Sequence, residues 1–401
     1  MQIEPILVPA IPPMPVRVGY DAQALVSEDG GTGKGVHLRN LITSRWAKFE
    51  GYAPAGNKMQ VTGVLQGGSS RYLIWQQTSL PRLLSTYKPE VFLAPYNTAP
   101  IWLPRATQLV LVLHDLIAMH KFKQDTLKKT VVNSYKRLLI MPSVAQASYV
   151  LTVSEFSRRQ ILKVFPDARV IVIPCTIPAS WFELSASINM RQRANYILLV
   201  TAAAPHKNTA RALRAYALYV KLAGPGAANL RVAGLSQSGS HFRTMVSDLG
   251  LANRVIFEPL ISTSTLQDLY RTATAVLFPS LLEGFGIPVL EAMASGTPVV
   301  TSRGSSLSEV GGEAPRYCDP LNEVSIADAL LEVVGNVNLR EEMARKGRIR
   351  ATKFHPDSVR PRIDSFWRQI ASEHTTKSSN GPGDGFHEHC KSNGGGVSAK
   401  R

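Results

Sequence analysis

Residues 278–300 read FPSLLEGFGIPVLEAMASGTPVV, and this stretch decides how the rest of the chain is interpreted. Its pattern predicts the end of a buried strand, a glycine-containing loop, a helix with Pro288 in its first turn, and a second strand after a Gly-Thr-Pro turn. Glu283 falls in the loop, and Glu291 falls in the helix eight positions later. Carboxylates and unpaired backbone amides at such a strand-to-helix junction can bind the hydroxyls and phosphates of a ligand.

Acidic residues on a loop and an amphipathic helix are usually part of a solvated surface, so the spacing alone is weak evidence. The neighbouring residues argue for a binding site instead. Glycines on both sides of Phe285 allow the backbone to approach a ligand closely. The small residues at 292–296 allow the helix to pack tightly on a sheet, and the β-branched residues that follow are typical of a buried strand.

This block resembles the Glu-x7-Glu element of the retaining family 4 glycosyltransferases, which have the GT-B fold and use nucleotide sugars. The resemblance implies an α/β fold in which two doubly wound, Rossmann-like domains face a central cleft. It also implies that Glu291 binds the ribose hydroxyls of the donor. Glu283 and the backbone of Phe285 and Gly286 would then contact the donor sugar.

A second block, TAAAPHKNTARALRAY at residues 201–216, follows a predicted strand and opens a helix at Asn208 or Thr209. Lys207 is therefore expected at the helix entrance, where its ammonium group and the first backbone amides can share one anion, such as a pyrophosphate. The family commonly has a Lys-Asn pair here, preceded by an arginine that also contacts phosphate. This chain has no arginine in the block before Lys207, so the second phosphate contact stays unassigned. A solvated lysine beside a helix N-cap is the alternative.

His114, in the segment VLHDLIAMH, follows a predicted strand at the edge where open α/β sheets bind ligands. It resembles the histidine of related mannosyl- and rhamnosyltransferases that lies near the donor sugar, and a histidine satisfied in the core is the alternative. Gly33 belongs to the glycine-rich loop GGTGKG at residues 30–35, which does not match a Walker A motif. The loop resembles the first loop of family 4 enzymes, which approaches the donor phosphate and the acceptor. A mobile surface loop is the alternative here.

Two roles are therefore predicted for the site residues. The residues expected to bind the donor are Gly33, Lys207, Asn208, Phe285, Gly286, Ile287 and Glu291, and those expected to act in catalysis are His114 and Glu283. No Asp-x-Asp pair occurs in the chain, and such a pair normally holds the metal of GT-A enzymes. Catalysis is therefore expected without a bound metal and without a cofactor, the nucleotide sugar being a substrate.

Composition limits the classes of protein that fit the chain. The 401 residues are enough for two cores, and the formal charge of +16 favours an anionic partner. No RNA-binding signature or zinc-finger spacing is present, so nucleic acid is not the expected partner. Three separated cysteines indicate a reducing compartment, and the proline-rich start, which carries Glu4, does not resemble a signal peptide. A cytoplasmic protein is expected, with peripheral contact to the inner face of the membrane.

Apolar runs alternate with helical patterns along the chain, which predicts parallel, doubly wound sheets. The expected strands lie at 16–20, 61–65, 91–94, 109–113, 149–153, 170–173, 196–200, 230–233, 255–257, 275–278 and 298–301. The expected helices include 36–49, 126–145, 157–164, 209–222, 324–334, 339–351 and 355–370. We divide the chain into an acceptor-side domain at 1–178, a nucleotide-sugar-binding domain at 179–354, a helix at 355–371 that returns to the first domain, and a disordered tail at 372–401.

The segment VSEFSRRQI after the strand at 149–153 predicts a helix start that is capped by Ser154 and Ser157. Ser308 and Glu309 match a family turn beside the nucleotide, for which a structural role is expected. Basic residues gather on the predicted helix at 35–49, with Trp46 and Phe49, and on the stretch after residue 126. Such helices fit an anionic membrane and a lipid-linked acceptor, with simple solvated faces as the alternative.

The expected activity is transfer of a hexosyl unit, mannosyl from GDP-mannose in the first instance, to a hydroxyl of a growing and lipid-linked glycan. The resemblance implies retention of the anomeric configuration. Two other classes remain open: another GT-B enzyme, such as a UDP-sugar transferase or a nucleotide-sugar epimerase, and a non-enzymic scaffold derived from a transferase. The oligomeric state is left open.

Overall fold

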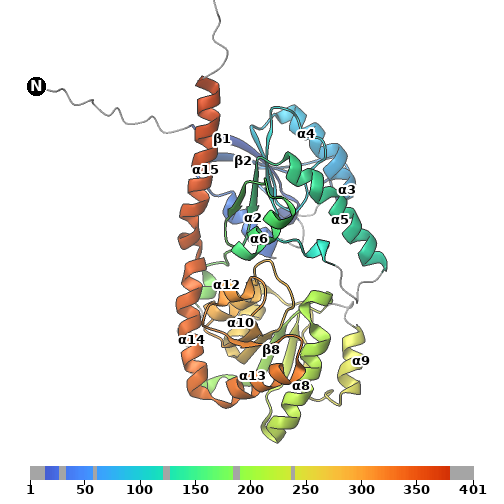
Figure 1. The fold of residues 1–401 in the computed structure, drawn as a ribbon, viewed down its shortest axis with the longest axis vertical. Coiled ribbons are helices and arrows are strands. Elements are labelled where there is room, and N and C mark those ends of the chain that lie inside the picture. Colours follow the sequence, from blue (N-terminus) through green and yellow to red (C-terminus); the bar gives the residue numbers. More distant parts are fainter. Residues whose placement is uncertain are drawn as a thin grey trace, which may run out of the picture.

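The computed structural model describes residues 14–26, 33–56, 61–120, 127–183, 190–235 and 240–379 (Figure 1). Each half of the sequence builds one parallel sheet with helices packed on it. In Figure 1 the first half, coloured blue to green, lies above the second half, coloured green to orange.

Among the described residues, the first sheet has seven parallel strands in the order β3-β2-β1-β4-β5-β6-β7. These are β1 Val16–Asp21, β2 Ala47–Ala53, β3 Val64–Gln66, β4 Val91–Ala94, β5 Gln108–Val112, β6 Tyr149–Thr152 and β7 Val170–Val172. In the same described part, the second sheet has six parallel strands in the order β10-β9-β8-β11-β12-β13. These are β8 Ala194–Val200, β9 Asn229–Ala233, β10 Val255–Phe257, β11 Ala273–Phe278, β12 Val299–Ser302 and β13 Arg316–Cys318.

Both sheets reverse their strand order next to the first strand of the half, between β1 and β4 and between β8 and β11. Ligands of doubly wound folds bind at this reversal, outside the carboxyl ends of the strands. The predicted fold class, two doubly wound Rossmann-like units, is therefore confirmed.

Helices connect the strands and cover both faces of each sheet (Figure 1). They are α1 Gln23–Val26, α2 Gly33–Leu41, α3 Tyr72–Ile74, α4 Leu80–Tyr87, α5 Leu127–Gln146, α6 Glu155–Val164, α7 Ser180–Glu183, α8 Thr209–Ala223, α9 Ser240–Asp248, α10 Thr263–Thr272, α11 Ile287–Ala294, α12 Leu307–Gly311, α13 Glu323–Gly335, α14 Val337–Ala351 and α15 Pro356–Ser379. No helix in this described part of the chain is both long and apolar enough to cross a bilayer.

The strands carry apolar side chains on both faces because helices pack on both faces of each sheet. In β4, Leu93 packs toward α2 and α15, while its neighbour Phe92 packs toward Trp75 and α4 on the opposite face. In β11, Leu277 joins the core beneath α8 and α13, while Val276 joins the core beneath α11. Successive side chains of a strand point to opposite faces, so a continuous apolar run is what a doubly covered sheet requires.

The predicted helix at 36–49 is wrong in its second half. Helix α2 ends at Leu41, and Ala47–Ala53 forms β2, which pairs with β1 over residues 47–52. Gly51 opposes Tyr20 in this ladder, and Phe49 packs edge-on against Trp367 with the ring centroids 5.3 Å apart. The basic amphipathic helix that predicted membrane contact through Trp46 and Phe49 therefore does not exist.

The predicted strand at 61–65 begins three residues later, at Val64, and the expected tail at 372–401 is also partly wrong. Helix α15 continues to Ser379, while the remaining tail residues lie outside the described part of the chain. The last turns are held by packing that local composition does not reveal. Tyr149 donates a hydrogen bond to Glu373 at 2.5 Å, and a ring nitrogen of His374 lies 2.8 Å from the Gln108 side-chain oxygen.

Helix α15 returns from the second half to the first, as predicted for the segment at 355–371. In Figure 1, α14 and α15 run along one side of the whole molecule. Ile363, Phe366, Trp367 and Ile370 of α15 are buried in the core of the first half. The indole nitrogen of Trp367 donates a hydrogen bond to the Leu41 carbonyl at 2.8 Å.

Trp367→Ala should lower the stability of the first half by about 3–5 kcal/mol, because it removes a fully buried indole and leaves a cavity. Thermal unfolding followed by circular dichroism measures the effect, with Leu331→Ala on the exposed side of α13 as the matched control. A melting temperature for Trp367→Ala equal to that of the control would show that α15 does not stabilise the first half.

Candidate active site

A pocket of about 520 Å³ lies at the carboxyl ends of the first sheet and is completed by the second half. The first half contributes residues that follow β1, β4, β5, β6 and β7. The second half contributes Lys207 and residues 283–288, which lead from β11 into α11. This volume is typical of small-molecule sites, and the position is the one at which α/β sheets bind ligands.

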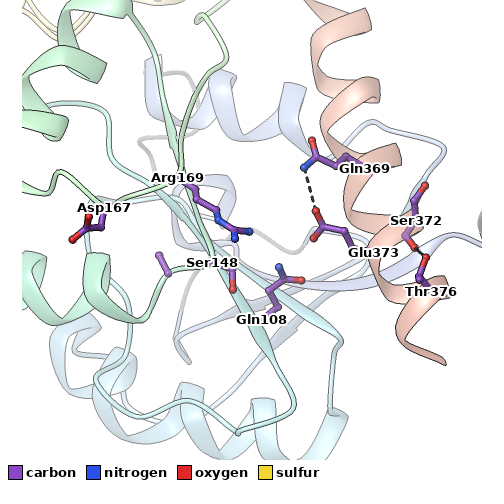
Figure 2. Close-up of a pocket in the computed structure, with 9 residues that line it drawn as sticks. Gln108, Ser148, Asp167, Arg169, Gln369, Ser372, Glu373 and Thr376 are labelled. Atoms are coloured by element: carbon purple, nitrogen blue, oxygen red, sulfur yellow. Dashed lines mark hydrogen bonds between the residues drawn. The ribbon is translucent and has the colours of Figure 1, made fainter. Parts of the chain in front are cut away.

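A second hollow lies at the opposite end of the first sheet (Figure 2). Gln108, Ser148 and Arg169 line it, and they stand at the amino ends of β5, β6 and β7. Its other wall is α15, where Gln369 donates a hydrogen bond to Glu373. None of the predicted site residues lies there, so the pocket at the carboxyl ends is the candidate active site.

Seven of the nine predicted site residues line this pocket: Gly33, His114, Lys207, Glu283, Phe285, Gly286 and Ile287. Asn208 and Glu291 do not line it. The structure also brings in residues that the sequence analysis missed as ligand contacts, among them Gln23, Lys34, Tyr72, Tyr96 and Asp115.

The loop before α11 is fixed from α12. The Ser306 hydroxyl lies 2.9 Å from both the Glu283 and the Phe285 carbonyl oxygens. Gly286 has a φ of +105°, and a β-carbon there would lie 2.5 Å from a methyl group of Leu307. Only glycine fits this position without strain, and it turns the chain into α11 beside the pocket, which residues 285–288 line.

Lys207 and Glu283 form the central charged pair of the site. The Lys207 Nζ atom lies 2.7 Å from Glu283 Oε1, and the two side chains are 20% and 9% exposed. The ammonium group also lies 5.1 Å from the centre of the Phe278 ring. A turn at Pro205–Lys207 holds the lysine here, and the His206 carbonyl accepts a hydrogen bond from the Leu281 amide at 2.7 Å. The predicted lysine and carboxylate therefore meet on one side of the cleft.

Asn208 has a structural part instead. Its side-chain amide donates to the Pro279 carbonyl at 3.0 Å and to the Pro320 carbonyl at 2.7 Å. Its side-chain oxygen Oδ1 accepts a hydrogen bond from Arg211 at 2.7 Å. These bonds lock the entrance of α8 and leave donor binding by this side chain without geometric support. Arg211 is bonded to Asn208 and does not line the pocket. Lys34 does line it and is a second cation there, besides Lys207.

His114 is buried at the end of β5 and is held in one orientation. Its backbone amide donates to the Asn97 side chain at 2.8 Å, and its Nε2 atom lies 3.0 Å from the Pro95 carbonyl. Because a carbonyl only accepts, Nε2 carries the proton and Nδ1 keeps its lone pair. Burial first, and then the neighbouring His37 and Lys34, hold the pKa of His114 well below 6.5, so the ring is neutral.

The ring of His37 packs edge-on against His114, with ring centroids 5.4 Å apart. His37 is 1% exposed, and neither of its ring nitrogens has a hydrogen-bond partner among the described residues. Burial lowers its pKa to about 4. This uncharged ring maintains the low-dielectric surroundings that keep His114 neutral.

The two halves meet at Gly284, where backbone touches backbone. A β-carbon on Gly284 would lie 2.7 Å from the His114 carbonyl oxygen and 2.9 Å from the Asp115 β-carbon. The Gly284 carbonyl accepts hydrogen bonds from Ser154 at 2.7 Å and Ser157 at 3.2 Å. The predicted capping role of Ser154 is confirmed, because its hydroxyl accepts from the Ser157 amide at 3.0 Å, but it also joins the halves.

Two further contacts connect the halves around the pocket. The Glu309 carboxylate accepts hydrogen bonds from the Glu155 and Phe156 amides at 2.9 and 3.0 Å. A carboxylate at the first amides of α6 is favourable because those amides carry partial positive charge. Across the cleft, a β-carbon on Gly33 would lie 3.1 Å from Ile287, so α2 and α11 begin side by side.

Glu291 lies one turn into α11, and it accepts a hydrogen bond from the Tyr270 hydroxyl at 2.8 Å. Burial raises its pKa from 4.5 to about 7, and the bond from Tyr270 opposes this shift only in part.

No three His, Cys, Asp or Glu side chains gather in metal-binding geometry within the part of the chain that is described. Catalysis without a metal stays a prediction.

The architecture, two doubly wound units that face one cleft and share one pocket, defines the GT-B class. Residues 36–181 match the family described as Glycosyltransferase Family 4, and residues 182–350 match the family described as Glycosyl transferases group 1. The chain belongs to this family 4 (group 1) set of retaining glycosyltransferases.

Curated relatives support the assignment. The chain is 31% identical over 288 residues to O-antigen chain mannosyltransferase B of Escherichia coli. The aligned region covers 68% of this chain and 72% of that protein. It is 33% identical over 201 residues to O-antigen chain mannosyltransferase RfbU of Salmonella typhimurium, over 50% of this chain. That alignment spans about half of the relative, 54% of its length. Sucrose-phosphate synthase from Thermosynechococcus elongatus has the same fold, with a TM-score of 0.71, 16% identity, and coverage of 89% of this chain and 100% of that one.

Gly284→Ala should separate the two halves at the pocket, because its β-carbon would overlap the His114 carbonyl. We expect a loss of about 1–3 kcal/mol in stability and a large loss of donor binding. Gly304→Ala is the matched control, since nothing lies within 4 Å of its β-carbon position. Melting temperature and nucleotide affinity are the measurements, and equal behaviour of the two variants would contradict the close approach.

Glu291→Gln should make the ligand-free protein more stable at alkaline pH. The folded state keeps a proton on Glu291 up to a pKa of about 7, whereas an unfolded carboxyl loses it near 4.5. The unfolding free energy contributed by this group therefore falls as pH rises between those values. Glutamine removes that loss, so the variant should be about 2 kcal/mol more stable than the wild type at pH 8, with a smaller difference at pH 5. A variant less stable than the wild type at pH 8 would show that the folded carboxyl is charged.

Proposed function

We propose that this protein transfers a hexosyl unit from a nucleotide sugar to a hydroxyl of a growing glycan, with retention at the anomeric carbon. The pair of Lys207 and Glu283, 2.7 Å apart at the wall of the pocket, is the observation that carries the proposal. Mannose from GDP-mannose is the favoured donor, and this choice is supported by the activity named for both relatives, O-antigen chain mannosyltransferases.

The donor would be bound by an exchange of partners. In the ligand-free protein Lys207 neutralises Glu283, and a diphosphate would replace the carboxylate as its anion. Glu283 would then accept hydrogen bonds from sugar hydroxyls. The backbone amides of residues 285–287, in the loop and at the first position of α11, belong to residues that line the same pocket and would add neutral donors for the phosphate or sugar oxygens. Glu291 does not line this pocket, but it lies one turn further along α11, and in this proposal it would receive the ribose hydroxyls.

The chemistry needs no protein nucleophile. The bond between the anomeric carbon and the diphosphate oxygen breaks while the acceptor oxygen bonds to the same face of that carbon. The acceptor proton passes to the departing phosphate oxygen. Lys207 and the amides of α11 would stabilise the charge that develops on this phosphate. His114 would orient the sugar through its unprotonated Nδ1, because Nε2 is occupied by Pro95.

The acceptor in this proposal is attached to a lipid, which would bring the enzyme to the inner face of the cytoplasmic membrane. The two relatives act on O-antigen chains by name, and this supports a glycan acceptor. The side chains of the basic residues early in α5 lie outside the described part. Arg137 of that helix is occupied, because it donates to the Ala118 and Met119 carbonyls at 2.9 and 3.1 Å.

Lys207→Ala and Glu283→Ala should each lower transfer by about 10²–10³-fold while the protein stays folded, because each removes one charge that faces the donor. Purified variants are compared with the wild type in a donor screen that scores transfer and hydrolysis. Lys346→Ala is the control, because it breaks an exposed ion pair of the same type, 2.6 Å long, on α14. Full activity of either site variant would remove the proposed mechanism.

The same preparation separates the rival functions. Calorimetric titration with GDP and UDP should show binding of one of them, and a protein that binds neither would be a scaffold. Product analysis should show retention of configuration. An inverted product, or a free epimerised sugar without transfer, would place the protein in another GT-B chemistry.

A further inference from the structure

One end of the pocket is not used by the donor in the proposed function. It is built at the carboxyl ends of β1 and β4 from Gln23, Tyr72 and Tyr96, with the buried carboxyl of Asp21 behind them. Asp21 ends β1, Tyr96 follows β4, and Tyr72 opens α3. These residues share the pocket with Lys207 and Glu283 but belong to the other half of the molecule.

Hydrogen bonds fix the polar atoms at this end. The Tyr72 hydroxyl donates to Asp21 Oδ2 at 2.7 Å and accepts from the Gln76 side chain at 3.0 Å. The Tyr96 hydroxyl accepts from the Ala24 amide at 2.6 Å. The Tyr72 and Tyr96 rings meet edge to face, with centroids 6.3 Å apart. The result is a rigid corner of two aromatic rings and their hydroxyls.

The corner stands at a distance from the donor end that suits a second sugar. Gly284 touches the His114 backbone after β5, so the loop that would hold the donor sugar lies over β5. Strand β4 separates β5 from β1, and two strand spacings amount to about 10 Å. A sugar held against Tyr72 and Tyr96 could therefore direct a hydroxyl toward the anomeric carbon of a donor over β5.

The charged residues of the pocket indicate whether that second sugar is neutral or phosphorylated. Among the described residues that line the pocket, the cations are Lys34 and Lys207. Lys207 is paired with Glu283, and Lys34 lies close enough to His114 and Asp115 to act on the pKa of both. Both cations therefore serve the donor end, whereas the corner holds a carboxyl. Burial raises the pKa of Asp21 to about 7, so the corner already disfavours one negative charge.

We propose that this corner binds an uncharged sugar residue of the acceptor, and that Asp21 with Tyr72 and Tyr96 excludes phosphorylated acceptors. Aromatic rings pack on the C–H faces of sugars, and fixed hydroxyl oxygens pair with sugar hydroxyls. A phosphate at the same place would lose its water without gaining a cation, and it would lie beside the Asp21 carboxyl. The inference rests on the proposed function and names the class of acceptor for it.

The test measures sugar binding directly, on the full-length protein saturated with GDP or UDP, whichever binds. Saturation-transfer NMR is recorded with matched probes: methyl α-D-mannopyranoside against mannose 6-phosphate, methyl α-D-glucopyranoside against glucose 6-phosphate, and myo-inositol against myo-inositol 3-phosphate. At least one neutral probe should bind about tenfold or more tightly than its phosphorylated partner. Equal or tighter binding of the phosphorylated partners, or no signal from any neutral probe at 10 mM, would overturn the proposal.

Two conservative variants test which side chains cause the preference for neutral over phosphorylated sugars. At pH 8, above the Asp21 pKa of about 7, Asp21→Asn removes a negative charge with little change in size and should narrow the difference between neutral and phosphorylated probes by about fivefold or more. Tyr72→Phe keeps the ring and should weaken the neutral probe by about fivefold. Tyr87→Phe on the exposed end of α4 is the control and should change neither value. If Asp21 were only structural, Asp21→Asn would weaken both probes equally and leave their ratio unchanged, which contradicts the proposal.

Nucleotide affinity separates this inference from the proposed function. All three variants should bind the nucleotide as the wild type does, since none of these side chains faces the donor end. A wild-type protein without nucleotide affinity refutes the proposed function itself. Normal nucleotide affinity with a preference for phosphorylated sugars refutes only the assignment of the acceptor.

Discussion

The pocket exists because two stretches of backbone touch at Gly284 without a side chain between them. The carbonyl of this residue receives hydroxyl groups from Ser154 and Ser157, which also belong to the start of α6. The same contact sets the loop before α11 over the end of β5, where His114 lies. This contact and the bonds from Ser306 to the Glu283 and Phe285 carbonyls together position the loop before α11. A larger residue would move every group that faces the ligand.

The charged side chains at the centre of the site, Lys207 and Glu283, are paired with each other in the ligand-free protein. Both side chains are largely buried and neutralise one another, so neither charge is left unpaired at the wall of the pocket. His114 and His37 are both neutral because burial disfavours their charged forms. Under the proposed function, Lys207 would become available to a diphosphate only when its bond to Glu283 breaks.

Much of the fold could be predicted because doubly covered parallel strands need continuous apolar runs, which are easy to recognise. The runs at 91–94, 149–153 and 255–257 lie within a residue of the observed strands. Strand β2 was missed because AKFEGYA carries the exposed residues Lys48 and Glu50, and because only residues 42–46 separate it from the end of α2. The end of α15 was missed because its stability comes from Tyr149 and Gln108, more than 200 residues away in sequence.

The site could be predicted where one short motif supplies both the residues and their geometry, as in the block from Phe278 to Val300. Glu283 and Lys207 come from two such motifs, and they meet in the structure. The acceptor-side corner could not be predicted in this way. Tyr72 and Asp21 are 51 residues apart, and only the order of the strands brings them together. Asn208 is a motif residue whose side chain bonds to the Pro279 and Pro320 carbonyls, and its part in donor binding stays a prediction.

The polypeptide passes between the two halves twice, once between β7 and β8 and once between α14 and α15. If the contacts at Gly284 and Glu309 open, two connections favour rotation of the halves about the line that joins these connections. The second connection is stiff, because helices occupy both of its sides and only a short turn at Thr352–Phe354 separates them. The same rotation of the two halves would then admit the substrate and release the product. The bending of the turn at Thr352–Phe354 would limit its angle.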